Sequence, residues 1–293
     1  MADVAVVVCT RDRPQLLNGI VPALVRAQRA GAEVVVVDSA SRDARTQAIA
    51  EQAGLTVVRC ERPGASRARN AGVAATTAPV IAFTDDDCRP HPGWESVFAS
   101  VFVDESVGFA TGRVLPGDGS GRAMSPMLEE EPARYTATDP IDDMGHGACM
   151  AFRRTAIEAV SGFDEVLGAG APLRASEEKD LFWRVLRAGW EGRYVPAAVV
   201  DHAAWRGHGE SLRNGFRYGV GIGALVAKIA RLEGRRTAGP VFRRAVACLP
   251  QMAGTIRQRY RFATVDLMMR AVGILVGGLR ARRYRLAEGR FVD

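Results

Sequence analysis

Three consecutive carboxylates, Asp85, Asp86 and Asp87, follow directly on the apolar run 79–83. A buried strand that opens into three adjacent acids is electrostatically costly unless a positive group binds there. In open α/β sheets, ligands bind at the carboxyl ends of the strands, which is where these acids lie. Asp oxygens suit hard cations, so the triplet predicts a site for Mg²⁺ or Mn²⁺ carrying a diphosphate. The alternative interpretation is an acidic turn that is simply solvated.

The chain before the C-terminal region alternates strand and helix patterns. The expected strands are apolar runs at 4–9, 33–38, 55–59, 80–84 and 192–200. The expected helices begin near Pro14 and then cover 43–53, 64–75, 92–103, 153–160 and 176–188. Continuous apolar runs, rather than alternating ones, fit strands that are buried on both faces. The order therefore predicts an α/β fold with a mostly parallel sheet flanked by helices.

Polar side chains stand at or just after the ends of these strands. They are Thr10, Arg11, Arg13, Asp38, Arg67, Arg69, Asn70, Asp85, Asp87 and His202. The planar fork of Arg binds two phosphate oxygens, and an acid placed like Asp38 contacts the ribose or base in nucleotide-binding sheets. Each residue alone also fits a structural cap or a surface ion pair. Together they predict a site for a nucleotide diphosphate.

The charge of the chain is unevenly distributed. Residues 206–293 contain 18 Lys and Arg residues against 5 Asp and Glu residues, so this segment carries +13 and residues 1–205 carry −7. We therefore expect a catalytic body over 1–205 and a basic, amphipathic helical region over 206–293. A basic amphipathic helix is typical of a membrane interface, and nucleic acid is the other anionic candidate. A helix that packs on the body, with a solvated basic face, is the alternative without a partner.

The sequence favours a cytoplasmic location, peripheral on the inner face of the cell membrane if the basic region binds lipid. No basic and apolar leader opens the chain, and no apolar segment reaches the roughly 18–20 residues of a spanning helix. The five cysteines are scattered, and none forms a CxxC pair. This favours a reduced protein with neither a zinc site nor a disulfide framework.

Several segments in order resemble family 2 glycosyltransferases of the GT-A fold, the Rossmann-like fold of nucleotide-diphospho-sugar transferases. The resemblance covers about 1–205 and rests on segments 6–14, 36–41, 64–72, 83–88, 147–154, 162–165, 177–184 and 195–202. It implies a nucleotide-diphosphate sugar as donor, Mn²⁺ or Mg²⁺ as cofactor and an inverting transfer to an acceptor hydroxyl. One such segment is a weak signal, whereas the ordered set is specific.

The resemblance also implies roles for individual residues. In 83–88, Asp85 and Asp87 take the metal-binding positions of the family's DxD motif, with His202 as a further metal or phosphate contact. The donor is expected to meet Thr10, Arg11, Arg13, Asp38, Arg67, Arg69, Asn70, Asp85 and Asp86. Glu178 aligns with the general base, and Glu177 remains a candidate because the family has Glu-Asp where this chain has two Glu residues. His146 and Trp205 are the acceptor-side candidates. Cys149 stands where the family often has Asn, which leaves the usual contact there open.

Other functions remain open on the sequence alone. A nucleotidyltransferase also uses paired Asp residues, but it normally has glycine in its opening loop, and Cys9–Pro14 has none. A non-catalytic sugar-nucleotide-binding or membrane scaffold protein is a second alternative. A nucleic-acid-binding role is disfavoured because the basic region has no recognised motif. Cell-envelope or lipid-linked glycan synthesis is the expected setting, with a soluble natural product as the alternative acceptor.

Overall fold

The computed structural model describes residues 3–117, 127–203, 208–234, 236, 238–239, 242–243 and 261–292. The chain forms two compact units. The first comprises Met1–Asp139, Asp143–Phe163 and Leu181–Ala204, and the second comprises Pro140–Asp142, Asp164–Asp180 and Trp205–Asp293. The second unit thus takes in Asp164–Asp180 besides the C-terminal region. The expected division at 205 stays a prediction.

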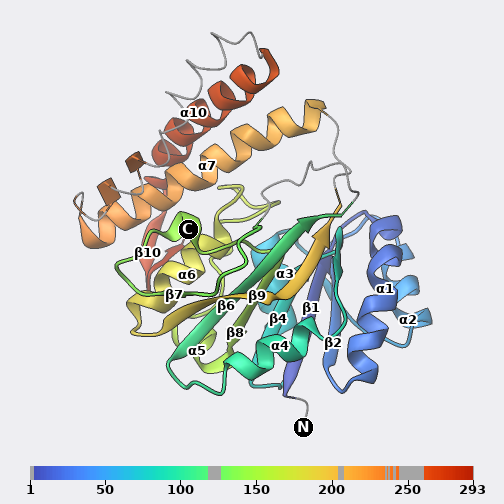
Figure 1. The fold of residues 1–293 in the computed structure, drawn as a ribbon. Coiled ribbons are helices and arrows are strands. Elements are labelled where there is room, and N and C mark those ends of the chain that lie inside the picture. Colours follow the sequence, from blue (N-terminus) through green and yellow to red (C-terminus); the bar gives the residue numbers. More distant parts are fainter. Residues whose placement is uncertain are drawn as a thin grey trace. The chain divides into compact units, whose positions relative to one another are not determined.

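The first unit is built on a nine-stranded sheet of order β3-β2-β1-β4-β8-β6-β9-β5, with β7 paired to β9 (Figure 1). Strands β1, β2, β3 and β4 are parallel neighbours, and β6 is parallel to β9. Strand β8 is antiparallel to both β4 and β6. The strands are β1 (Val4–Thr10), β2 (Glu33–Ser39), β3 (Thr56–Cys60), β4 (Val80–Asp85), β5 (Cys88–Pro90), β6 (Val107–Pro116), β7 (Ala133–Tyr135), β8 (Cys149–Arg153) and β9 (Glu191–His202).

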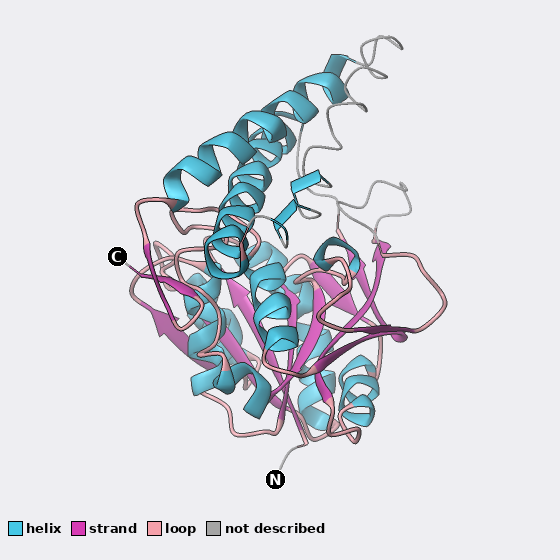
Figure 2. Cartoon of the chain, turned by 90° about the vertical axis from the view of Figure 1, so that its left-hand side faces the viewer, coloured by secondary structure: helices cyan, strands magenta, loops and turns pink. Residues whose placement is uncertain are grey.

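Helices cover both faces of this sheet (Figure 2). They are α1 (Pro14–Arg29), α2 (Arg45–Gln52), α3 (Ala65–Ala74), α4 (Trp94–Val101), α5 (Arg154–Ala159) and α6 (Glu177–Arg187), the last of which begins in the second unit. Side chains alternate along a strand. Accordingly, Val6 and Val8 pack with α1, α2 and α4, while Val7 packs with α3, α5 and α6. The expected α/β fold with its helix-flanked sheet is confirmed.

Close packing of α3 on the sheet brings polar residues to the strand ends. A Cβ on Gly72 would overlap the side chain of Val7 and would approach that of Val37 to 3.3 Å. Only glycine therefore allows this helix to lie directly on β1 and β2. Arg67, Arg69 and Asn70 lie within its first six residues.

The second unit contains two long helices and a C-terminal hairpin. Helices α7 (His208–Glu233) and α10 (Arg261–Ala281) lie side by side, followed by β10 (Arg285–Ala287) and β11 (Arg290–Val292). A short 3₁₀ helix, η1 (Ile141–Asp143), lies near the unit boundary. A Cβ on Gly223 would overlap the carbonyl oxygen of Ile274, and one on Gly277 would overlap that of Val220. The two backbones therefore touch through small residues, as helices packed in membranes often do. Among the described residues, no helix is both long and apolar enough to cross a membrane.

Candidate active site

The strand register places several candidate residues side by side. Thr10 on β1 is paired with Asp38 on β2, and Asp38 is paired with Arg59 on β3. On the other side of β1, Cys9 is paired with Asp85 on β4. The carboxyl ends of these parallel strands thus form one polar edge, where the sequence predicts that the ligand binds.

Asp86 is buried among groups from the β1 end. Its carboxylate accepts a hydrogen bond from the Thr10 hydroxyl at 2.6 Å and pairs with the Arg13 guanidinium at 3.1 Å. Burial raises the pKa of Asp86 to about 7, against the opposing effect of the Arg13 charge. In this structure Asp86 supports Thr10 and Arg13, and its predicted contact with the donor remains a prediction.

Asp87, Cys88 and His202 form the candidate metal centre. Their ligand atoms all lie within 4.8 Å of one another, and all three residues are buried. The Asp87 carboxylate is 3.4 Å from Nε2 of His202, and a second Asp87 oxygen is 3.6 Å from Arg13. Strand β5 pairs with β9 so that Cys88 faces His202, which brings the histidine to the end of β4. The Asp87 carboxylate fits Mn²⁺ or Mg²⁺ and the His202 imidazole fits Mn²⁺ as a further ligand, whereas a thiol suits softer metals.

Asp85 points to a different partner. Its carboxylate pairs with the Arg69 guanidinium at 3.2 Å, and its side chain is 36% exposed. The Arg69 guanidinium also stacks over the Phe163 ring at 5.5 Å. Asp85 is therefore outside the three-residue cluster in this structure. Its part in metal binding stays a proposal, supported by its partly exposed carboxylate two residues before Asp87.

The carboxylate of Asp38 is buried and held from two sides. It accepts a hydrogen bond from the Ser41 backbone N–H at 2.9 Å and one from the Arg59 guanidinium at 2.5 Å. Arg59 also donates to the Ser41 carbonyl at 3.1 Å. These contacts fix the carboxylate at the end of β2. Arg59 was not among the sequence candidates. Its position at the end of the expected strand 55–59 was a signal that could have indicated a partner for Asp38.

The remaining donor candidates differ in their surroundings. The Asn70 amide bonds both the N–H and the carbonyl of Phe163, at 2.8 and 3.0 Å, so it anchors that loop. Arg67 donates to the Pro63 carbonyl at 3.3 Å, and Arg11 lies 3.7 Å from Asp12. Arg11 directly follows β1 and is exposed, so its guanidinium is accessible to phosphate.

The acceptor-side candidates are only partly described. His146 is half-buried in the turn before β8, and its carbonyl accepts from the Cys149 N–H at 3.4 Å. Trp205 lies outside the described residues. Glu177 is buried and Glu178 is half-buried, and both belong to the first turn of α6. The exposure of Glu178 makes it the more accessible of the two carboxylates.

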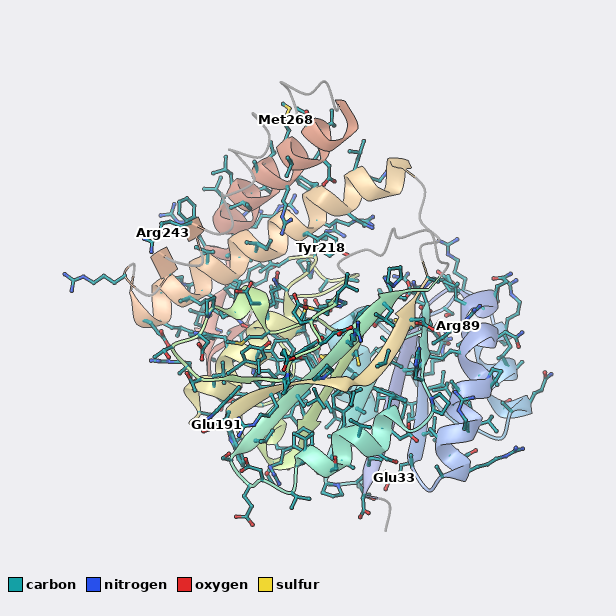
Figure 3. All side chains as sticks on the ribbon, in the orientation of Figure 1. Glu33, Arg89, Glu191, Tyr218, Arg243 and Met268 are labelled. Carbon is teal, nitrogen blue, oxygen red and sulfur yellow. The ribbon has the colours of Figure 1, made fainter. Side chains whose placement is uncertain are left out.

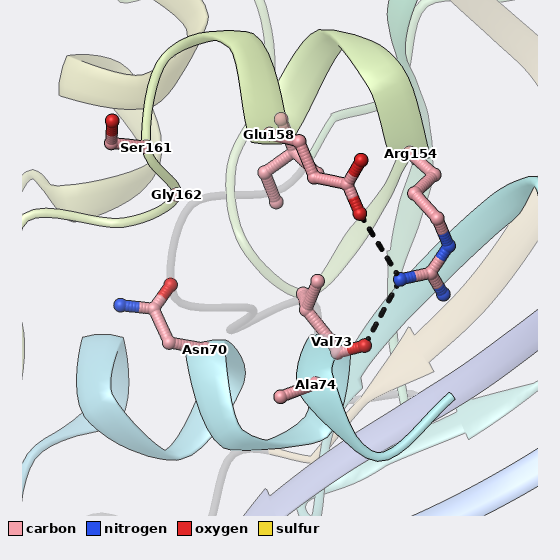
Figure 4. A pocket seen from close by; sticks show the side chains of 8 residues that line it. Asn70, Val73, Ala74, Arg154, Glu158, Ser161 and Gly162 are labelled. Carbon is pink, nitrogen blue, oxygen red and sulfur yellow. Dashed lines mark hydrogen bonds and ion pairs between the residues drawn. The ribbon is translucent and has the colours of Figure 1, made fainter. Parts of the chain in front are cut away.

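A surface hollow of about 520 Å³ lies between α3 and α5 (Figure 4). Asn70, Arg154 and Glu158 line it. Arg154 donates to the carbonyls of Val73 and Ala78, at 3.1 and 2.8 Å, and pairs with Glu158 at 3.6 Å. These bonds join α5 to the end of α3. Of the strand-end candidates described above, only Asn70 lines the hollow, and we assign the hollow no ligand.

Comparison with known families decides the classification. Residues 5–161 match the family model described as glycosyl transferase family 2. The chain belongs to glycosyl transferase family 2. The match spans every parallel strand from β1 to β4 and the acids at their ends. The predicted family is thereby confirmed.

Curated relatives of this family-2 chain are glycosyltransferases. A pre-mycofactocin glycosyltransferase of Mycobacterium tuberculosis is 29% identical over 99% of this chain and 60% of the relative. Glycosyltransferase AglE of Haloferax volcanii is 26% identical over 64% of this chain and 62% of the relative. The chain thus spans about 60% of the length of these relatives.

Solved structures share the fold of this family-2 chain. Mannosyltransferase PcManGT from Pyrobaculum calidifontis, in complex with GDP-Man and Mn²⁺, matches with a TM-score of 0.64 at 21% identity, covering 94% of this chain and 87% of the other. S. aureus TarS matches with a TM-score of 0.59 at 17% identity, covering 81% of this chain and 41% of the other. The expected GT-A fold is therefore confirmed.

Proposed function

We propose that this protein transfers a sugar from a nucleotide-diphosphate donor to an acceptor hydroxyl. The observation that carries the proposal is the buried pair of Asp87 and His202, with Arg13 3.6 Å from Asp87, at the edge of the sheet where Asp38 lies near the end of β2. A cation, a guanidinium and an acid together are the chemistry that a nucleoside diphosphate needs. Family membership and the Mn²⁺ and GDP-Man in the PcManGT complex support this assignment.

The donor binds along the polar edge of the sheet. Asp38, held by Arg59 and Ser41, accepts from the ribose or base beside Thr10, and Arg11 and Arg13 meet the phosphates. Arg67, Arg69 and Asn70 shape the same side from α3. Asp87 and His202, with Asp85 two residues before Asp87, would hold Mn²⁺ or Mg²⁺. When bound, the ion neutralises charge that develops on the leaving diphosphate.

Glu178 removes the proton from the acceptor hydroxyl. A carboxylate must lie within hydrogen-bond reach of that hydroxyl to act as general base. A single displacement with one base inverts the anomeric carbon, unlike the paired carboxylates of retaining glycosidases. Glu177 is the alternative base, and His146 and Trp205 are the proposed acceptor contacts.

The test is donor turnover. The purified protein is incubated with UDP-, GDP- and dTDP-sugars in Mn²⁺, Mg²⁺ or EDTA, and free nucleotide is measured together with thermal stabilisation. We expect one nucleotide to give metal-dependent release and a rise in Tm. If the folded protein neither binds nor cleaves any donor, the scaffold alternative is favoured.

The C-terminal unit offers a surface that fits an anionic membrane. Five side chains of α10 recur every three or four residues and are 42–67% exposed: Val265, Met268, Val272, Leu275 and Leu279. Met268 and Tyr218, exposed residues of α10 and α7, are labelled in Figure 3. The stripe ends at exposed Arg280, Arg282, Arg283 and Arg285. An apolar face with arginines beside it matches acyl chains with anionic headgroups, which favours a lipid-linked or cell-envelope acceptor over a soluble one.

Vesicle binding tests this surface. We expect the protein to sediment with phosphatidylglycerol-containing vesicles. The double variant Leu275→Ser/Leu279→Ser should bind them roughly tenfold more weakly, because it removes apolar side-chain area that the lipid would bury. Val103→Ser is the matched control, since Val103 is 82% exposed in the first unit. Unchanged binding by the double variant, or preference for duplex DNA over vesicles, would contradict the assignment. The assignment would also be contradicted if the double variant lost self-association but still bound vesicles.

A further inference from the structure

A fully buried lysine lies at the centre of the second unit. The Lys228 ammonium, on α7, is 2.5 Å from Oδ2 of Asp164 and 2.6 Å from Oδ1 of Asp180. None of the three side chains is exposed to solvent. The ammonium also lies 4.6 Å from the centre of the Phe291 ring. Phe291 in turn donates its backbone N–H to Asp164 at 2.7 Å.

This arrangement is costly and therefore informative. Burying one ammonium with two carboxylates removes three charges from water, and an apolar core of equal volume is often as stable. A buried ionic group of this kind is better explained by the geometry it enforces than by the stability it adds. Lys228 sits far from the strand-end residues in sequence, and the proposed chemistry does not use it.

The two carboxylates mark the ends of one segment. Asp164 opens and Asp180 closes the segment Asp164–Asp180 of the second unit, which carries Glu177 and Glu178. Lys228 bonds both ends, so it closes this segment into a loop. Within it, Leu167 and Leu173 are buried against Ala224 of α7 and Phe291 of β11.

The backbone that leads into α6 also requires an external constraint. Arg174 and Ser176 both have positive φ values, 73° and 69°. Non-glycine residues rarely adopt this left-handed conformation, and they keep it only where surrounding contacts hold it. Directly after them, the Asp180 N–H donates to the Ser176 carbonyl at 3.0 Å. The first turn of α6, which contains both candidate bases, therefore follows two residues in a strained backbone conformation. Asp180, at the end of this turn, is bonded to Lys228.

We propose that Lys228 is a positioning residue for the general base, an inference that rests on the proposed function. Its ammonium joins Asp164 to Asp180 and fixes the first turn of α6, so that the Glu178 carboxylate is held where the acceptor hydroxyl arrives. Phe291 closes the other side of the ammonium. The C-terminal helices and hairpin are therefore needed for turnover, even though they carry neither the metal ligands nor the base.

Three variants of the full chain test the proposal. The bonds from the Lys228 ammonium to Asp164 and Asp180 are called the Lys228 staple below. Lys228→Met removes this staple but leaves two buried carboxylates. Asp180→Ala keeps a one-to-one Lys228–Asp164 pair and removes the bond between Lys228 and α6, so it leaves fewer buried charges unpaired than Lys228→Met does. Arg231→Met is the matched control, because Arg231 lies one turn further along α7 and donates to the carbonyls of Ala281 and Tyr284, at 3.1 and 2.9 Å.

The readouts are amide hydrogen exchange over 176–187 and the steady-state constants for the donor found in the turnover panel. We expect Lys228→Met and Asp180→Ala to speed exchange in the first turn of α6. We also expect them to lower kcat roughly 100-fold, as small displacements of a catalytic group do. The donor KM should stay within about twofold, since donor binding does not involve the staple. Arg231→Met should speed exchange only around 281–284 and keep kcat.

Two results would overturn the proposal. One is wild-type exchange and wild-type kcat in Asp180→Ala. The other is a loss of kcat that follows the loss of Tm equally in all three variants, which is the behaviour of a purely structural contact. If the wild-type protein turns over no donor, the proposed function fails on that result alone, and the exchange data still decide whether Lys228 fixes α6.

Discussion

Replacing Asp87 with Asn is expected to lower donor turnover by roughly 1,000-fold, because a metal clamp on a diphosphate is worth several kcal/mol in the transition state. Asn keeps the shape of the side chain and removes the negative charge that faces His202 and Arg13. The loss should be accompanied by weaker Mn²⁺ or Mg²⁺ dependence of donor binding. The measurement is kcat, with thermal stabilisation by nucleotide and metal measured in parallel.

Asp201→Asn is the matched control for this variant. Asp201 precedes His202 on β9, is 35% exposed and pairs with His91 at 3.2 Å, outside the metal cluster. Its replacement should leave turnover within about twofold of wild type, as surface ion pairs contribute little. Cys88→Ala should also retain metal-dependent activity, because Mn²⁺ and Mg²⁺ prefer oxygen ligands to thiols. Equal losses in Asp87→Asn and Asp201→Asn would argue against a metal at Asp87.

Replacing Glu178 with Gln is expected to lower kcat by about 10²–10⁴-fold, the usual contribution of a general base. Gln has the same size but cannot accept the proton of the acceptor hydroxyl. The donor KM should change little, because the donor is bound by the strand-end residues. Measuring both constants separates loss of chemistry from loss of binding.

Glu177→Gln distinguishes the two neighbouring acids. Glu177 is 8% exposed, whereas Glu178 is half-buried, so only Glu178 is well placed to meet an incoming acceptor. We expect Glu177→Gln to retain most of the activity. If it is the inactive variant and Glu178→Gln is active, the assignment is reversed. If both variants remain active, the base lies outside this turn.

The polar edge of the sheet was predictable because it follows from strand order. The apolar runs 4–9, 33–38 and 80–84 became β1, β2 and β4, and parallel neighbours bring their C-terminal residues together. Thr10, Asp38 and Asp87 could therefore be chosen before any coordinates. His202 lies beside Asp87 because β9 pairs with β5, where His202 faces Cys88, the residue after Asp87.

Pairings between distant side chains were not predictable. The sequence does not reveal that Arg59 binds Asp38, that Arg69 takes Asp85, or that Asn70 anchors Phe163. These depend on how far α3 and β3 reach along their neighbours. Strand β6 was also missed, because Val107–Pro116 contains two glycines and two residues with polar side chains and lacks a continuous apolar run.

The Lys228 staple was beyond sequence reasoning for a related reason. Its three members are separated by 64 and 48 residues along the chain. Lysine in an amphipathic helix is normally solvated, and only the packed second unit shows that this one is fully buried. The apolar stripe of α10 was expected. Which residues of the stripe are exposed depends on how the glycines of α10 pack against α7.

The most direct test of the account is to locate the cation. Crystals grown with Mn²⁺ and the nucleoside diphosphate selected by the turnover panel would give an anomalous difference map at the manganese edge. The account predicts one strong peak within coordination distance of the Asp87 carboxylate and Nε2 of His202. A peak held by other residues, or nucleotide bound at the strand ends with no peak at Asp87, would contradict it.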